Sequence, residues 1–393
     1  MVKAAAVIVS FFLASGFRTA PAGGPRRLPS GGGASGQVSS AHVTLPSYLE
    51  MVRAFARNPT PDSIARFVAR GEQWRIQSLR ELLAAIAHRD VEALAALPAA
   101  ILIHIEAFLD NAGGAQATDG NVGAALQLLD AAGRSVPADF RRRCQLLILW
   151  AFQAALDVET LVPQLQAAID RFGPDADLLV AQGTLFELLA SRSGAEVQTL
   201  RVPPVDVVRE LTTRSVNLSE AVRMGTPAEA LLQVERPGIY RLAARLYRRA
   251  LALSRSPEAK LRLGKVSIEA GEHRAALQVL EELVTAREGS TRQRYLAQLF
   301  VGRACLVLGD ADGALRAYRT AEEWYPGCQT PLVASSEALW MSGEVEGARA
   351  VMMQVLSDGA RTSCPEDPWL SYHQGQSWRI RPTLRELERE VAR

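Results

Sequence analysis

The segment LRLGKVSIEAGEHRAALQVLEEL, residues 261–283, places small residues at fixed offsets inside an otherwise apolar helical pattern. Gly264 lies in the middle of the first predicted helix, where glycine costs about 1 kcal/mol relative to alanine. Such a residue is expected where a second helix crosses so closely that a larger side chain would push the two axes apart. Gly271 then follows the last apolar residue of that helix. The segment therefore predicts two helices in tight contact, joined by a short turn.

The same arrangement recurs twice downstream, at residues 299–326 and 334–356. The glycine that ends the first helix returns after 38 and then 34 residues. Glycine at that place adopts the left-handed C-cap conformation without the penalty of a Cβ atom. The chain is thus predicted to contain repeated helical hairpins. The aligned positions are Gly264, Gly302 and Ser336, then Gly271, Gly309 and Gly343, then Ala276, Ala314 and Ala348.

This pattern resembles the tetratricopeptide repeat (TPR), a helix-turn-helix unit of about 34 residues. The match is strongest in the middle unit, and weaker in the last, where Ser336 replaces the glycine. The chain as a whole resembles the exported, Ala- and Leu-rich TPR proteins of bacteria. The resemblance implies an all-α solenoid of antiparallel helix hairpins. The residues that carry it are Val301, Gly302, Gly309, Asp310, Ala314, Tyr318, Ala321 and Pro326.

The pattern also divides the chain. Helical patterns in 46–95 do not fall into register with the repeats, and a domain boundary inside 191–238 is an alternative to a plain connection. At the C-terminal end, an amphipathic helix above Trp369, Tyr372 and Trp378 is expected to cover the apolar face of the last repeat; a ligand site is the alternative. The predicted organisation is a signal peptide at 1–22, a Gly/Pro/Ser-rich linker at 23–45, degenerate TPR-like repeats at 46–190, an irregular connection at 191–238, regular TPR repeats at 239–358 and a C-terminal cap at 359–393.

The first 22 residues have the features of an export signal. Lys3 precedes the apolar run AAAVIVSFFLASGF, and Ala20-Pro21-Ala22 offers small residues for cleavage. The run is short for a membrane span, which needs about 20 residues. We expect a periplasmic or secreted protein without a membrane span after signal removal. An N-terminal anchor or a buried first helix is the alternative.

Charge and cysteine content exclude some functions and leave one question open. The formal net charge is only +2 and basic residues are spread along the chain, which argues against nucleic acid as the main partner. The four cysteines show no C-x-x-C spacing, so no metal site is predicted. Cys144 and Cys305 lie on apolar helical faces and are expected to be buried thiols. Cys328 and Cys364 could form a disulfide if one repeat separates them.

No catalytic motif is present. The sequence lacks G-x-x-x-x-G-K-[ST], H-E-x-x-H and G-x-S-x-G, and its five histidines share no ligand spacing. His104 interrupts an apolar run and is expected to be a satisfied interior residue. We therefore predict no enzyme activity, no cofactor and no metal. The alternative, an enzyme or small-ligand protein assembled from distant helices, requires two or more of His88, His104, Asp119 and Glu187 around one closed pocket.

The TPR resemblance implies a concave groove lined by the first helix of each hairpin, and a protein or peptide as the partner. Some TPR proteins hold a terminal carboxylate with Lys and Asn, but the matching positions here contain no Asn. An extended or helical peptide is expected to lay apolar side chains across the groove. Two alternatives stay open: further chain, such as 191–238, fills the groove, or the protein is a self-associating structural spacer. The candidate partner-binding residues are Lys265, Leu299, Arg303, Leu306, Glu337 and Trp340.

Overall fold

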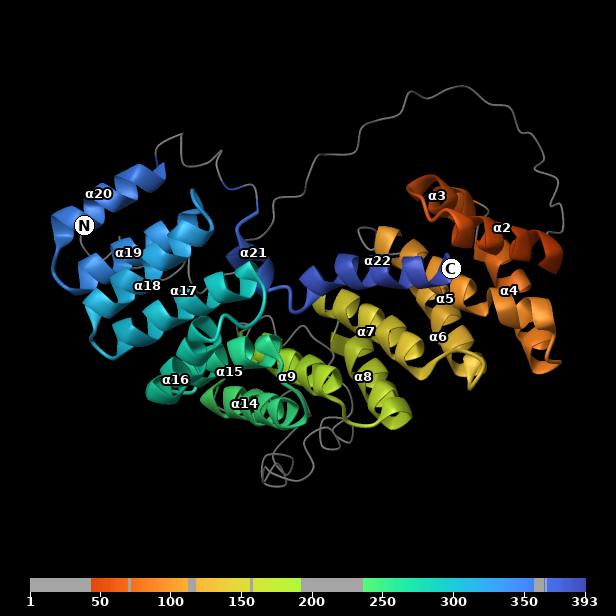
Figure 1. Ribbon diagram of the computed structural model, residues 1–393, viewed down its shortest axis with the longest axis horizontal. Helices are drawn as coiled ribbons and strands as arrows, with labels where there is room; N and C mark the ends of the chain where they lie inside the picture. Colours follow the sequence, from red (N-terminus) through yellow and green to blue (C-terminus); the bar gives the residue numbers. More distant parts are fainter. Residues whose placement is uncertain are drawn as a thin grey trace. The chain divides into compact units, whose positions relative to one another are not determined.

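The computed structural model describes residues 44–69, 72–111, 118–155, 158–191, 236–356, 364 and 366–393. All regular structure in these ranges is helical, as predicted. The chain forms two compact units, Met1–Val136 with Glu388–Arg393, and Pro137–Leu387 (Figure 1). The predicted signal peptide, nearly all of the linker and most of the connection 191–238 lie outside the described residues.

The first unit is built around its longest helix, α5, which contacts each of the other four. The chain breaks between α2 and α3 at Asn58 and Pro59. Among the described helices, α5 is long and apolar enough to cross a membrane, but most of that stretch is buried, as in the core helix of a folded unit. The helices of this unit are α2 (Leu45–Arg57), α3 (Pro61–Ala69), α4 (Glu72–Ala87), α5 (Val91–Asn111) and α6 (Thr118–Ala132).

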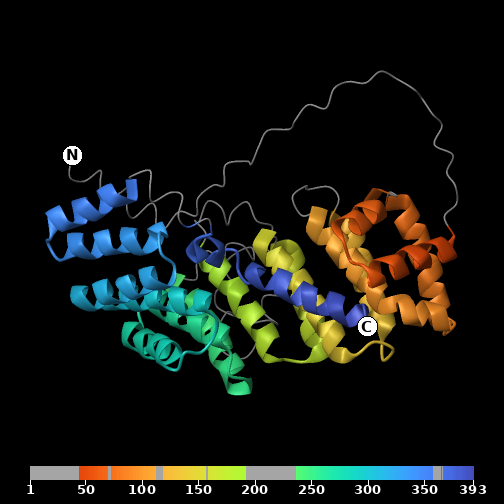
Figure 2. The ribbon, with the colours of Figure 1, turned by 45° about the horizontal axis from the view of Figure 1, so that its top comes forward.

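In the second unit, each described helix from α7 to α20 packs against the next described one along the chain, and α9, α15, α17 and α19 also contact one another in succession (Figure 2). This is the packing expected of a helical solenoid, in which each hairpin buries its faces against its neighbours. Its helices are α7 (Ala138–Ala155), α8 (Val158–Phe172), α9 (Ala176–Ser191), α14 (Arg236–Leu253), α15 (Pro257–Glu269), α16 (His273–Thr285), α17 (Thr291–Val307), α18 (Ala311–Trp324), α19 (Gln329–Met341), α20 (Val345–Leu356), α21 (Pro368–Tyr372), the 3₁₀ turn η3 (Ser377–Arg379) and α22 (Ile380–Val391), which continues into the residues assigned to the first unit.

The hairpin turns have the geometry predicted from their glycines. The φ angles of Gly271, Gly309 and Gly343 are 84°, 84° and 90°, in the left-handed region. In the middle hairpin, the Asp310 N–H donates to the Cys305 carbonyl at 2.9 Å, and the equivalent bond recurs in the other two. This Schellman arrangement satisfies carbonyls at the end of the first helix and reverses the chain. The turns therefore fix where each second helix begins.

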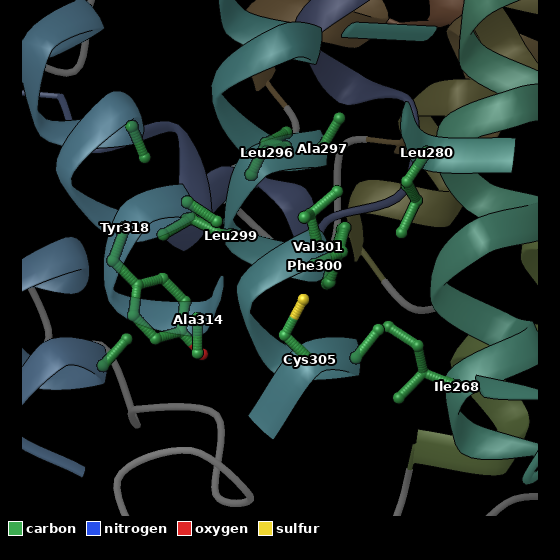
Figure 3. Packing of buried hydrophobic residues seen from close by; sticks show 14 of the residues in the cluster. Ile268, Leu280, Leu296, Ala297, Leu299, Phe300, Val301, Cys305, Ala314 and Tyr318 are labelled. Carbon is green, nitrogen blue, oxygen red and sulfur yellow. The ribbon is translucent and has the colours of Figure 1, made fainter. Parts of the chain in front are cut away.

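The glycines inside the first helices lie where the sequence places a close crossing. A Cβ atom built on Gly264 would lie within 3 Å of the Leu280 side chain, and one on Gly302 within 3 Å of the Tyr318 ring. Figure 3 shows Leu280 and Tyr318 on either side of the α17 side chains in the buried core. The absent side chain of each glycine thus makes room for a large residue of the second helix.

Two further hairpins use the same contact in modified form. Gly183 of α9 faces Tyr247 of α14, so these helices pair although residues 192–235 separate them. In the last hairpin, the Ser336 hydroxyl donates to the Ala348 carbonyl at 2.9 Å, which satisfies a polar group in a buried crossing. The two helices that flank the connection therefore belong to one unit, the second.

Candidate functional site

The described residues of the second unit form a polar site where residues 364 and 366–379, here called the C-terminal segment, lie against α7, α9, α15, α17 and α19. We call the whole surface that the last four of these helices present on the side of the segment the first-helix face. The segment is fixed at its start by a disulfide between Cys328 and Cys364, whose Cα atoms are 4.9 Å apart. The sequence left this bridge open, and the structure contains it.

Asp367 anchors the segment next to the disulfide. Its carboxylate accepts hydrogen bonds from the Tyr295 hydroxyl at 2.9 Å and from the Thr330 hydroxyl at 2.6 Å. The same carboxylate accepts from the Trp369 N–H at 2.9 Å and so caps α21. One side chain therefore joins α17 and α19 to the start of the segment.

Aromatic side chains hold the next part of the segment. The rings of Trp369 and Tyr372 lie 5.4 and 5.2 Å from the Phe300 ring of α17, centroid to centroid. Arg292 donates to the Ser371 hydroxyl at 2.9 Å and lies over the Trp378 ring at 5.5 Å. These contacts place the segment along the first-helix face, whereas the sequence predicted a cap over the last hairpin. The reason is local: α17 offers Phe300 and Arg292 as partners for the segment's aromatic residues.

Glu187 of α9 is the centre of the site. Its carboxylate accepts hydrogen bonds from the Tyr372 hydroxyl at 2.7 Å and from the Tyr247 hydroxyl at 2.9 Å. It also pairs with Arg262 at 3.0 Å and with Lys265 at 3.5 Å. All five side chains are buried. A buried carboxylate is stable only with such a full set of partners.

Arg262 of α15 links that carboxylate to the backbone of the segment. Its guanidinium donates to Glu258 at 2.7 Å and to the Gly375 carbonyl, and it lies over the Tyr372 ring at 4.9 Å. Gly375 has a φ of 66°, and a Cβ atom there would lie 3.0 Å from the Gln153 side chain of α7. The site therefore binds the ring and the hydroxyl of Tyr372 and the backbone carbonyl of Gly375.

The charges of this site keep each other ionised. Burial alone would raise the pKa of Glu187, but Lys265 and Arg262, with the two tyrosine hydroxyls, lower it to about 2. Burial likewise opposes the charge of Lys265, and Glu187 outweighs it and raises the pKa of that ammonium. Burial and the neighbouring carboxylate raise the pKa of Tyr372 well above its usual range, so its hydroxyl keeps the donated proton. The carboxylates of Glu187 and Glu258 thus face two cations, Arg262 and Lys265, inside the unit.

Three of the predicted partner-binding residues are buried. Lys265 belongs to the site around Glu187 and lies over the Tyr240 ring at 4.6 Å. Leu299 and Leu306 belong to the apolar core that α17 shares with its neighbours. A partner could reach these side chains only after rearrangement of the residues that cover them. Whether they take part in binding stays a prediction.

The other three predicted residues are nearer to solvent. Arg303 of α17 pairs with Glu337 of α19 at 2.9 Å, which joins two successive hairpins at their first helices. Trp340, one turn further along α19, has 45% of its surface exposed. This part of the face offers an ion pair and a large apolar side chain to a partner.

Sequence reasoning missed the central role of Arg262 and Gly375. Arg262 was hidden between Leu261 and Leu263, and its partner Gly375 lies 113 residues away in the sequence. A charge inside an apolar helical run was the one available signal. The partner of such a charge is set by tertiary packing, which no local spacing reveals.

The residues of the enzyme alternative are divided between the two units. His104 is buried in the first unit, where Nε2 lies 3.1 Å from the Tyr48 hydroxyl and Nδ1 3.3 Å from the Asn121 amide oxygen. Glu187 belongs to the second unit, His88 is exposed, and the side chain of Asp119 lies outside the described residues. Within the described residues, no group of three or more His, Cys, Asp or Glu side chains could hold a metal ion.

The described residues are all-helical, and in the second unit the successive described helices pack as neighbours while the first-helix face holds a stretch of polypeptide. No protein-family model matches the chain, and no match was found among the curated proteins. The class of protein therefore follows from packing and from the contacts of the C-terminal segment.

Proposed function

We propose that this chain is a non-catalytic TPR-type scaffold that binds a protein partner through its first-helix face. The observation that carries the proposal is the C-terminal segment itself. Residues 367–379 are held there by hydrogen bonds, stacked rings and an ion-paired arginine. A surface that binds one stretch of polypeptide in this way has the chemistry to bind another.

The partner is expected at the part of the face that the segment leaves open. Arg303, Glu337 and Trp340 lie there, next to the exposed side chains of Val307 and Met341. A helical or extended peptide could pack an apolar side chain on Trp340 and pair a charge with Arg303 or Glu337. Aromatic and arginine side chains contribute much of the binding energy in such interfaces.

The test places a photo-crosslinking amino acid at position 303 or 340 of the full chain in its native cell. Position 319, an exposed arginine on the second helix α18, is the matched control. We expect one shared crosslinked protein at 303 and 340 that is absent at 319. Failure to crosslink at both sites, or equal crosslinking at all three, would contradict the proposal.

We also propose that the protein is exported, with residues 1–22 as the signal. The Cys328–Cys364 disulfide supports this, because such bonds persist in oxidising compartments. Mass spectrometry of the protein from its native cell would test it. We expect a mature N-terminus near Gly23 and no free thiol at position 364. A chain that keeps residues 1–22 in the cytoplasm would contradict export.

A second candidate, a structural spacer that self-associates, is favoured by one observation. On the last hairpin, Met353 and Leu356 of α20 are 62% and 58% exposed. Exposed apolar side chains at the end of a repeat array are available for packing against another molecule. Light scattering of the purified chain distinguishes the two: a defined oligomer that Met353→Glu dissociates would favour the spacer, and a monomer would contradict it.

A further inference from the structure

We propose that the C-terminal segment is a releasable intramolecular ligand, held by the Cys328–Cys364 disulfide, and that it blocks a site for a partner peptide with a tyrosine followed three residues later by a glycine. This deepens the proposed function, on which it rests. It adds a second, covered site to the open part of the face, and it names the chemistry of the peptide that would occupy it.

The contacts of the segment are those of a ligand with a binding surface. The crossings that hold the hairpins together, Gly264 on Leu280 and Gly302 on Tyr318, are made without it. The segment meets the face through polar groups at the ends of side chains and through the rings of Trp369 and Tyr372, which pack on Phe300. Tyr372 donates its hydroxyl to Glu187, and the Gly375 carbonyl accepts from Arg262. Any peptide with the same groups could make these bonds.

The site would select its peptide by three features. The Arg262 guanidinium stacks on a ring, and the Glu187 carboxylate needs a hydroxyl at the end of that ring. These two groups together favour tyrosine over phenylalanine, since the loss of one donor to a buried carboxylate is costly. Close approach of the Gln153 side chain and a φ of 66° then favour glycine at the position of Gly375.

The disulfide controls release because it ties the start of the segment to the N-terminus of α19. Cys328 is fully buried and Cys364 is half-buried, so a dithiol reductant would attack the Cys364 sulfur. The bond between the two cysteines breaks, and Cys328 leaves as a thiolate and takes up a proton. The second thiol of the reductant then displaces Cys364. The products are two cysteine thiols and the oxidised dithiol.

The test uses the full chain with Cys328→Ser, Cys364→Ser and Tyr372→Ala, which weakens the segment and leaves Glu187, Arg262 and Phe300 of the face unchanged. The probe is a fluorescent peptide of residues 366–380, and the matched control is the same peptide with Tyr372→Phe. By anisotropy, we expect the peptide to bind this variant at least about tenfold more tightly than the oxidised wild type, because the tethered competitor is weakened. The control peptide should bind more weakly than the parent peptide.

Two measurements make the outcome decisive. A variant with unchanged helicity by circular dichroism that does not bind the peptide, or binds both peptides equally, overturns the proposal. A variant that loses its helicity also overturns it, because the segment is then part of the fold. In the wild type, hydrogen exchange should accelerate on reduction in residues 368–379 but not in α15 and α17; acceleration in all three overturns the proposal.

Failure here is distinguishable from failure of the proposed function. Crosslinking at positions 303 and 340 probes the open part of the face and does not require release of the segment. A crosslinked partner without peptide binding would keep the scaffold function and overturn this inference alone.

Discussion

At the scale of single residues, Glu187 is a negatively charged side chain that is buried in the second unit. Its stability depends on Arg262, Lys265 and the hydroxyls of Tyr247 and Tyr372. A buried ion pair of this kind often adds little compared with apolar residues of equal volume, whereas removal of one partner is strongly destabilising. Any change that leaves one of these buried charges without its partner is therefore expected to lower the stability of the unit.

Glu187→Gln should lower the free energy of unfolding by about 3–5 kcal/mol, because Arg262 and Lys265 would remain buried with too little negative charge. Urea denaturation of the full chain measures this change. Glu323→Gln, at an exposed position of α18, is the control and should stay within about 0.5 kcal/mol of the wild type. Equal effects of both substitutions would contradict the role assigned to Glu187.

The same carboxylate predicts an acid-dependent loss of stability. Its pKa is about 2 in the folded protein and near 4.5 in the unfolded chain, so its contribution is complete above pH 4.5. As the pH falls from 4.5 toward 2, about 3 kcal/mol should be lost, since the unfolded state takes up the proton first. Unfolding curves across this range would show a steeper decline for the wild type than for Glu187→Gln. Parallel curves would refute the assignment.

At the scale of helices, the crossing of α17 and α18 depends on the absent side chain of Gly302. The same principle pairs α9 with α14 through Gly183, although a long stretch of chain separates those two helices. Helix propensity alone would favour alanine at each of these places, by about 1 kcal/mol. Close packing against a tyrosine ring overrides that preference.

Gly302→Ala should therefore destabilise the second unit by about 1–3 kcal/mol, because the new Cβ atom would displace the Tyr318 ring. Gly347→Ala, in α20 of the same unit, is the matched control, since its nearest neighbour would lie at an ordinary 3.6 Å. We expect that control to be neutral or slightly stabilising in thermal denaturation. A stabilising Gly302→Ala would show that the crossing is not close.

At the scale of the whole molecule, the Cys328–Cys364 disulfide closes a long ring across the end of the second unit, with a sequence separation of 36. Such a ring restricts the unfolded chain, and the chain-entropy model gives about 4 kcal/mol for a loop of this length. The bond thus stabilises the unit and keeps the C-terminal segment on its face.

Replacement of both cysteines by serine should lower the free energy of unfolding by up to about 4 kcal/mol. Denaturant unfolding of the oxidised wild type and of the double variant measures the difference. The Cys305→Ser variant, in which a single buried thiol is replaced, is the control for the serine substitution itself. A double variant as stable as the oxidised wild type would contradict this contribution.

The repeated hairpins could be predicted from the sequence because their information is local. The turn glycines, such as Gly271, end helices within a few residues of the carbonyl groups that the turns satisfy. The glycines inside the first helices, Gly264 and Gly302, contact a side chain of the second helix of the same hairpin. TPR membership and the partner-binding residues came from the same patterns, export came from residues 1–22, and all three stay predictions. The C-terminal segment was predicted to be a cap, and its aromatic residues instead lie against α17.

For the repeated hairpins of residues 261–356, the sequence by itself determined which segments are helical, where each turn falls and which helices cross closely, since these depend on contacts between near neighbours. Tertiary structure alone decided that Tyr372 reaches Glu187 across 185 residues and that Arg262 meets Gly375. The physical reason is that a buried charge has no preferred partner until folding excludes water. Only the folded chain determines which groups are then close enough to the charge to take the place of water.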